Sequence, residues 1–161
     1  MRPQFLRSSE KKKLVEEIKE AYGIEELPFL LLEVGKQKIR AYSGNLSKDE
    51  ITQLAHIVRV ETMGLYILSK RDGPARINFD ALPILKDQIT KNIVKINEEQ
   101  LNSWIRGNDL EIEAQEGFVV LQYQEDLVGT GKSTGNKILN YIPKERQIKS
   151  QTQKTIYNSN N

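Results

Sequence analysis

The residues best suited to bind or react with a ligand form the segment 129–135, Gly-Thr-Gly-Lys-Ser-Thr-Gly. This segment contains the Gly-Lys-Ser ending of a nucleotide-binding loop. A P-loop also needs a glycine five residues before the Gly-Lys pair and a helix directly after it, because backbone N–H groups and the helix N-terminus hold the phosphates. Asp126 occupies the glycine position, and Pro143 interrupts the short segment that follows. The pattern therefore predicts a glycine-containing strand and argues against an ATP site.

The net charge changes sign at this glycine segment. Residues 81–126 carry four Lys or Arg against nine Asp or Glu, a balance of −5, whereas residues 127–161 carry six against one, a balance of +5. Concentrated positive charge is typical of a surface that binds phosphates, although a solvated basic tail has the same composition. Phosphate-binding cations are therefore expected in the C-terminal segment.

Composition limits the class of protein. The chain has 161 residues, of which 38% are hydrophobic and 29% charged, so it can bury a core as one domain or as two small ones. It has no apolar run long enough to cross a bilayer and no apolar signal-peptide core, which favours a cytoplasmic location without a membrane partner. With no cysteine and one histidine, neither disulfides nor a metal site is expected, and no cofactor is expected either.

Residues 1–80 alternate helix and strand signals, which predicts a small α/β domain. A helix is expected from about residue 10 to 22, with Ser8 or Ser9 as its N-cap and Gly23 as its end. A hairpin is expected at residues 29–34 and 37–43. The capping box from Ser47 to Glu50 predicts a second helix to about residue 57, followed by strands at 64–69 and 75–79.

Residues 82–149 predict a second, strand-rich domain. A strand at 91–96 leads into a short helix that Asn97 caps and Gly107 ends. Further strands are expected at residues 110–114, 118–123, 127–132 and 137–142. Short strands with one helix favour a small barrel or pseudo-barrel, and the fold class is α+β. The polar residues 150–161 are expected to form a disordered tail.

The candidate RNA contacts lie in the basic segment. Glycines at alternate strand positions remove side chains from one face, so Gly129 and Gly131 would let a nucleic-acid backbone or base approach. Arg146 suits a bidentate phosphate contact, and Asn140 suits a base edge or a ribose hydroxyl. The full candidate set is Gly129, Gly131, Lys132, Lys137, Asn140, Lys144 and Arg146. Each has a structural alternative, because glycine also marks bulges and basic residues are often only solvated.

Two aromatic residues in this half also have two interpretations. Tyr141 either stacks on a base or belongs to the core. Trp104, beside Leu101 and Ile105 in a predicted helix, is expected in the core.

An ordered set of motifs in this half resembles a known RNA-binding domain. The motifs are Trp104-Ile-Arg-Gly107, Gly117-Phe-Val-Val-Leu121, Leu127-Val-Gly-Thr-Gly-Lys132, Leu139-Asn140 and Pro143-Lys-Glu-Arg146. Residues 82–149 resemble the PUA-like domain at the C-terminus of Sun-type 5-methylcytosine rRNA methyltransferases, which also occurs in small archaeal proteins without the enzyme. Residues 1–80 more loosely resemble the pre-PUA domains of archaeal and eukaryotic ribosome-biogenesis factors. The resemblance implies a pre-PUA-like domain, then a PUA-like pseudo-barrel with one or two short helices, and RNA as the partner.

The residues argue against methylation by this chain itself. Cytosine C5 reacts only after a thiolate adds to the ring, and the chain contains no cysteine. The glycines at 129, 131 and 135 also differ from the G-x-G-x-x-G spacing of dinucleotide sites. The expected function is non-enzymatic binding of structured rRNA or tRNA during RNA modification or ribosome biogenesis. The alternative is a protein interaction scaffold that docks on an RNA-modifying enzyme or a ribosome assembly factor.

Overall fold

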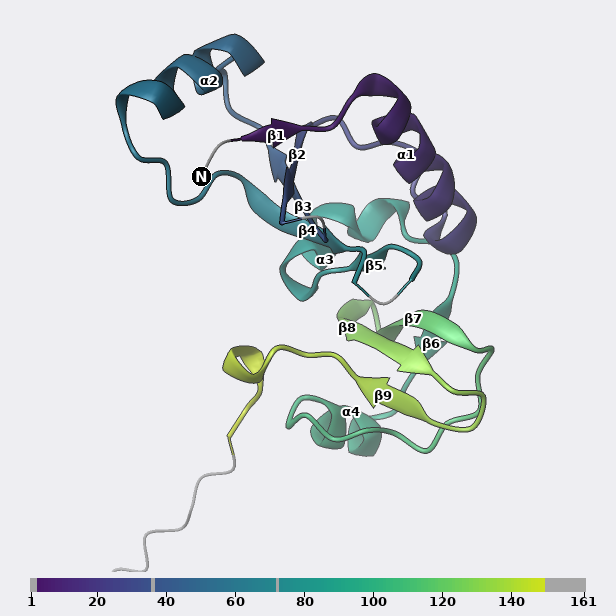
Figure 1. Cartoon of the computed structure of the whole chain (residues 1–161). Helices are drawn as coiled ribbons and strands as arrows, with labels where there is room; N and C mark the ends of the chain where they lie inside the picture. Colours follow the sequence, from purple (N-terminus) through teal and green to yellow (C-terminus); the bar gives the residue numbers. More distant parts are fainter. Residues whose placement is uncertain (1–2, 36, 72, 150–161) are drawn as a thin grey trace, which may run out of the picture.

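The strands form two sheets, one in each half of the chain (Figure 1). The computed structural model describes residues 3–35, 37–71 and 73–149, and the predicted tail at 150–161 lies outside the described residues. The N-terminal sheet has the order β1-β2-β3-β4-β5, and the C-terminal sheet has the order β6-β7-β8-β9. Together with the helices, these sheets confirm the α+β class.

All neighbouring strands of the N-terminal sheet are antiparallel. Its strands are β1 (Gln4–Phe5), β2 (Leu30–Val34), β3 (Lys38–Tyr42), β4 (Leu65–Ser69) and β5 (Arg76–Ile77). The predicted hairpin is confirmed, because β2 and β3 pair from Leu30 with Tyr42 to Val34 with Lys38. A register shift between Ile39 and Arg40 lets β4 continue beside β3.

Helix α1 (Ser8–Tyr22) covers one face of this sheet, the face that carries the buried core residues (Figure 1). Its Leu14, Ile18 and Tyr22 recur at helical spacing and are buried. The predicted serine cap is wrong, since both serines lie in the first turn. The N-cap is Arg7, whose backbone N–H donates to the Glu10 carboxylate at 2.7 Å.

Helix α2 (Lys48–Ile57) begins at the predicted capping box. Ser47 Oγ accepts a hydrogen bond from the Glu50 N–H at 3.2 Å, and Glu50 Oε2 accepts one from the Ser47 N–H at 2.8 Å. The bonds that the Glu50 carboxylate accepts from Ser47, from its backbone first and then from its hydroxyl, lower the pKa of Glu50. Ile51 is the buried residue of this helix, whereas Ile57 is 80% exposed.

A helical connector that the sequence analysis did not predict joins the two sheets. It consists of η1 (Phe79–Ala81), α3 (Leu82–Leu85) and η2 (Lys86–Gln88). Pro83 is tolerated because it stands in the first turn of α3, where its missing N–H costs no helical hydrogen bond. The Gln88 side chain accepts hydrogen bonds from the backbone N–H groups of Glu25 and Glu26, which fixes the connector to the end of α1.

The C-terminal sheet combines one parallel pair with two antiparallel pairs. Its elements are β6 (Ile93–Lys95), α4 (Glu98–Trp104), β7 (Gly117–Tyr123), β8 (Asp126–Ser133), β9 (Ile138–Asn140) and η3 (Lys144–Arg146). Strand β6 lies parallel to β7, and Asn97 caps α4 as predicted. The strand predicted at 110–114 is wrong. Leu110 alone makes a bridge, to Ile138, because the Ile112 N–H turns back to the Leu110 carbonyl.

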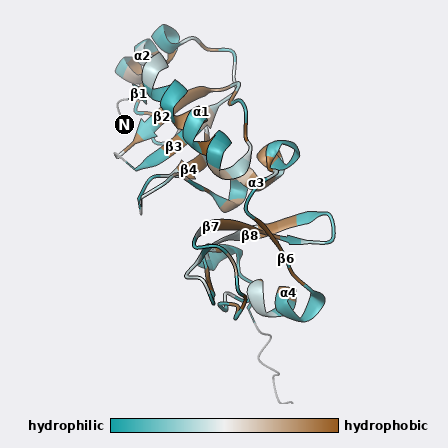
Figure 2. Ribbon diagram, turned by 90° about the vertical axis from the view of Figure 1, so that its right-hand side faces the viewer, coloured by the Kyte–Doolittle hydropathy of each residue, from teal (hydrophilic) through white to brown (hydrophobic). Residues whose placement is uncertain are grey.

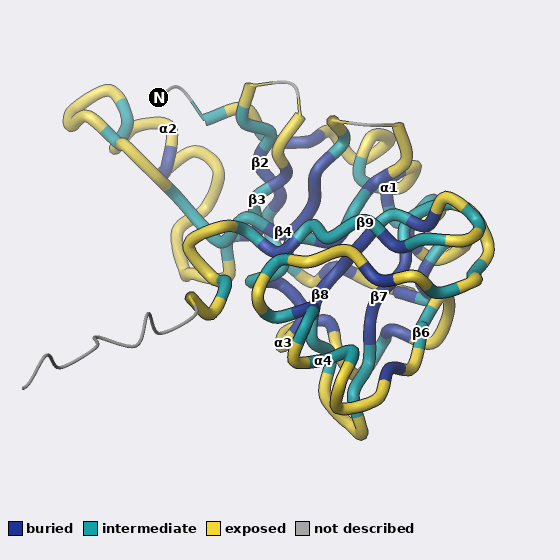
Figure 3. Tube along the Cα trace, turned by 90° about the horizontal axis from the view of Figure 1, so that it is seen from below, coloured by how far each residue is buried: buried dark blue, intermediate teal, exposed yellow. Residues whose placement is uncertain are grey.

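The two cores meet between the sheets. The N-terminal core includes Val120 of β7, and Phe79 packs against both cores. Figure 2 shows the strands β6, β7 and β8 directly beneath the N-terminal half, and Figure 3 shows buried segments in both sheets. Thr130 Oγ1 donates to the Ile77 carbonyl at 3.2 Å, so β8 and β5 are also joined by a buried hydrogen bond. The C-terminal sheet is therefore held at a defined position against the N-terminal one.

Candidate nucleic-acid interface

The Gly-Lys-Ser-Thr segment lies in a strand-to-turn region of an antiparallel hairpin. Residues Asp126–Ser133 form β8, which pairs with β7 along its length and with β9 at its C-terminal end. A P-loop requires these residues to wrap a phosphate before a helix. The prediction of a strand in place of a nucleotide loop is confirmed.

The face that Gly129 and Gly131 clear is internal, which corrects the expectation of an open face. A Cβ at Gly129 would lie 2.7 Å from Trp104 Nε1, and one at Gly131 would lie 2.9 Å from Trp104 Cη2. Trp104 is 0% exposed, and its Nε1 donates to the Val128 carbonyl at 3.0 Å. The two glycines therefore make room for the indole ring, as a core position for Trp104 requires.

Asn140 is tied into the protein by all three of its side-chain interactions. Its Nδ2 donates to the Trp104 carbonyl at 2.7 Å and to the Asn108 carbonyl at 3.0 Å, while its Oδ1 accepts from the Ile142 N–H at 2.8 Å. These bonds satisfy the end of α4 and fix the chain after β9. The expected base-reading amide is therefore engaged in structural contacts.

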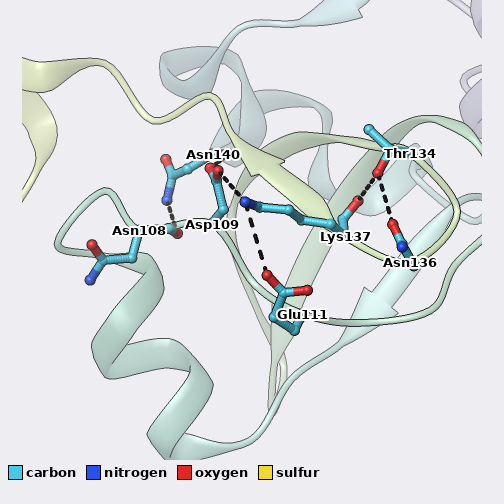
Figure 4. A network of polar contacts seen from close by, with 7 residues as sticks. All are labelled: Asn108, Asp109, Glu111, Thr134, Asn136, Lys137 and Asn140. Carbon is cyan, nitrogen blue, oxygen red and sulfur yellow. Dashed lines mark hydrogen bonds and ion pairs between the residues drawn. The ribbon is translucent and has the colours of Figure 1, made fainter.

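Lys137 faces acidic residues that precede it by more than 20 positions (Figure 4). Its Nζ lies 3.3 Å from Asp109 Oδ2 and 3.9 Å from Glu111 Oε1. Asp109 also accepts the Asn140 backbone N–H at 2.8 Å. Two nearby carboxylates offset the charge of Lys137, so its attraction for phosphate is weaker than that of an isolated lysine.

The other three predicted cations lie next to different kinds of group. Lys132 Nζ lies 5.7 Å from the centroid of the Phe118 ring. Arg146 pairs with Asp80 of the connector at 2.9 Å. Lys144 is exposed and has no ion-pair partner among the described residues. Contact of the predicted residues with RNA stays a prediction.

The structure places two further cations, Arg106 and Lys149, beside the predicted Lys144 and Arg146. The Ile148 N–H donates to the Ile105 carbonyl at 2.8 Å, and a Cβ at Gly107 would meet the Gln147 side chain. The end of α4 therefore lies beside the chain after η3, which brings exposed cations from both segments to one end of the molecule. We call this group the basic end; it consists of Arg106, Lys144, Arg146 and Lys149.

Arg76 is another cation outside the predicted set. It comes from the N-terminal sheet, and its guanidinium carbon lies 4.5 Å from the centroid of the Tyr141 ring. No sequence signal links the two residues, because 64 positions separate them and only the packing of the two sheets brings them together.

The charge reversal along the sequence is partly cancelled in space. Lys137 pairs with the acidic loop before β7, and Arg146 pairs with the connector. The cations left for a phosphate backbone are therefore fewer than the sequence suggests. They are Lys132 and the members of the basic end other than Arg146.

The described residues contain no group of three His, Cys, Asp or Glu side chains that could hold a metal ion. Within that same part of the chain, no helix has the length and apolar character that spanning a bilayer would require.

The C-terminal sheet, its short capped helix and the basic segment define a class of domain. Residues 91–148 match the family model described as "Methyltransferase RsmF PUA domain". Together with the relatives below, this match indicates that the segment is a PUA-like domain of the Sun-type rRNA methyltransferases.

The relatives are proteins named ribosomal RNA small subunit methyltransferase F. The chain is 28% identical to the one from Vibrio cholerae over 90 residues, which cover 55% of this chain and 19% of the relative. It is 29% identical to that from Vibrio vulnificus over 89 residues, with the same coverage of 55% and 19%. It is 28% identical to the one from Erwinia tasmaniensis over 102 residues, which cover 62% of this chain and 21% of the relative. The chain thus spans about one fifth of the length of these curated relatives.

Proposed function

We propose that this chain is an RNA-binding protein that acts, without catalysing a reaction itself, on structured rRNA or tRNA during RNA modification or ribosome biogenesis. The observation that carries the proposal is the PUA-domain match over residues 91–148 to relatives named as rRNA methyltransferases. The similarity covers about a fifth of those relatives, and the chain has no cysteine to add to cytosine C5. Both facts support binding as the role, with chemistry left to another protein or segment.

Backbone contact by exposed cations is the mechanism that the electrostatics favour. Phosphate contacts position a protein on RNA without reading its sequence. Lys132 and Lys144 lack ion-pair partners among the described residues, whereas Lys137 is offset by two carboxylates. We propose that the N-terminal half serves as a pre-PUA-like domain that holds the RNA-binding half and adds contacts of its own.

A matched pair of double variants tests the proposal. In Lys132→Ala/Lys144→Ala two candidate contacts are lost, whereas Lys12→Ala/Lys13→Ala removes the same charge from the exposed side of α1. Binding to tRNA and to rRNA fragments is measured by filter retention over a range of salt concentrations. Each phosphate contact contributes about 0.7 to 0.9 to the slope of log affinity against log salt, so the first variant should flatten the slope by about 1.4 to 1.8 and the second by less than about 0.5. Equal slopes in both variants would count against these contacts.

A docking scaffold is the second candidate, and one observation favours it. Helix α2 and its flanks expose large apolar side chains, which are Leu46, Leu54, Ile57 and Val58. Clustered exposed apolar side chains are typical of a protein interaction site. Absence of any salt-dependent RNA binding by the wild-type protein would favour a scaffold that docks on an RNA-modifying enzyme or assembly factor.

A further inference from the structure

A row of side chains, with two aromatic rings between two cations, crosses the seam between the two sheets. Arg76 of β5 stacks on Tyr141, with 4.5 Å between the guanidinium carbon and the ring centroid. Tyr141 meets Phe118 of β7 edge to face, with 5.9 Å between centroids and an angle of 89°. Lys132 of β8 lies over Phe118 at 5.7 Å. We call these four residues, all of them partly exposed, the seam strip.

Backbone pairing fixes the seam strip in place. Phe118 and Lys132 stand opposite each other in the β7–β8 pair, and the Tyr141 N–H donates to the Thr130 carbonyl at 3.3 Å. The hydrogen bond from Thr130 to Ile77 holds β8 against the strand that carries Arg76. The strip is therefore built before any ligand arrives, which reduces the entropy that binding must overcome.

The same pattern continues on the outer face of the N-terminal sheet. Arg76 pairs with Ser69, and Ser69 pairs with Lys38, so the three side chains project to one face of the sheet. That face lies opposite the core, since their neighbours Ile77, Leu68 and Ile39 are buried in it. Lys38 Nζ in turn lies 5.5 Å from the centroid of the Tyr66 ring.

The seam strip and its extension thus combine three cations with three aromatic rings. The cations are Arg76, Lys132 and Lys38, and the rings are those of Tyr141, Phe118 and Tyr66. None of these cations has an ion-pair partner among the described residues. The carboxylate of Glu116 lines a surface hollow together with Lys132, so negative charge lies beside the strip at this end.

Cations interleaved with aromatic rings suit one kind of RNA. Bases of a duplex are stacked on each other and unavailable, whereas unpaired bases stack on aromatic side chains while their phosphates meet nearby cations. We propose that the seam strip binds an unpaired segment of RNA, with bases against Tyr141 and Phe118 and phosphates near Lys132, Arg76 and Lys38. This inference rests on the proposed function and specifies its substrate as single-stranded.

Fluorescence anisotropy with two labelled RNAs tests the inference. The probes are a mixed-sequence single-stranded 12-mer and a fully paired hairpin, and the variants are Tyr141→Leu and Phe118→Leu. Tyr123→Leu is the matched control, because it makes the same change on β7 away from the strip. Loss of one stacked base should weaken single-strand binding about 5- to 100-fold and leave hairpin binding within about twofold, with the control like the wild type.

A further variant tests the extension of the seam strip on the N-terminal sheet without disturbing packing. Lys38 is exposed on β3, so Lys38→Ala should keep the fold while lowering the single-strand salt slope by about 0.7. Lys12→Ala is its control and should leave the slope unchanged. The inference is overturned if Tyr141→Leu and Lys38→Ala both bind the single strand as the wild type does, or if single-strand and hairpin binding fall equally. If the inference is overturned but the wild type still binds the hairpin in a salt-dependent way, the proposed RNA-binding function stands. If the wild type binds neither probe, both the proposed function and the single-strand inference are refuted.

Discussion

The two sheets bury their cores in different ways. The N-terminal core is spread over α1, the inner sheet face and the connector, and many aliphatic side chains share it. The smaller C-terminal core surrounds one fully buried indole ring, that of Trp104, which lies over two glycines. This contrast explains why conspicuous residues of the C-terminal half, Gly129, Gly131 and Asn140, serve the fold, while surface contacts fall to other side chains.

The largest expected effect breaks the C-terminal core. Trp104→Ala should lower the free energy of unfolding by about 3 to 5 kcal/mol, because it removes the largest buried side chain and its hydrogen bond to Val128. Hydrogen exchange should show greater loss of protection in β7–β9 than in β2–β4. Uniform loss of protection in both sheets would contradict the separation of the two cores.

A smaller effect is expected at Asn140. Asn140→Ala removes the side-chain partner of the Trp104 and Asn108 carbonyls and of the Ile142 N–H. The free energy of unfolding, measured by urea denaturation, should therefore fall by about 2 kcal/mol. The control is Asn136→Ala on the exposed turn of the same hairpin, which should stay within about 0.5 kcal/mol of the wild type. The RNA salt slope of Asn140→Ala should equal that of the wild type. If the variant is as stable as the wild type but binds RNA more weakly, Asn140 contacts RNA after all.

The smallest effect is expected in the distributed N-terminal core. Tyr22→Phe removes the hydrogen bond from the hydroxyl to the Ala75 carbonyl at 2.9 Å and should cost about 1 kcal/mol at neutral pH. Burial raises the pKa of Tyr22 far above its ordinary value of about 10. The unfolded chain therefore releases this proton first, so the wild type should lose stability as the pH rises above about 10. Tyr22→Phe should lose less over the same range, and parallel pH profiles of the two proteins would show that Tyr22 does not cause the alkaline loss.

Local signals predicted much of the fold. The capping box at Ser47, the N-cap at Asn97, the hairpin after α1 and the strand at β8 depend on residues a few positions apart, and the structure has all of them. The core position of Trp104 was also predictable from its helical neighbours. The strand at 110–114 failed because its backbone turns onto itself after a single bridge, which alternating apolar residues do not reveal.

The site was less predictable because its properties depend on distant residues. The glycine face could be identified as a cleared face, but only the packing of α4 shows that an indole fills it. Lys137 reads as a free cation until Asp109 is placed beside it. Arg76 belongs to the other sheet, so no motif of the C-terminal half contains it.

The central claim is that the protein binds RNA at the seam between its two sheets, through a few cations that have no ion-pair partner among the described residues and that lie next to aromatic rings. The most direct test is the affinity of the wild-type protein for the single-stranded 12-mer measured across a range of salt concentrations. With Lys132, Arg76 and Lys38 on phosphates, the slope of log affinity against log salt should be about −2. A slope near zero, or no binding at low salt, would contradict the account.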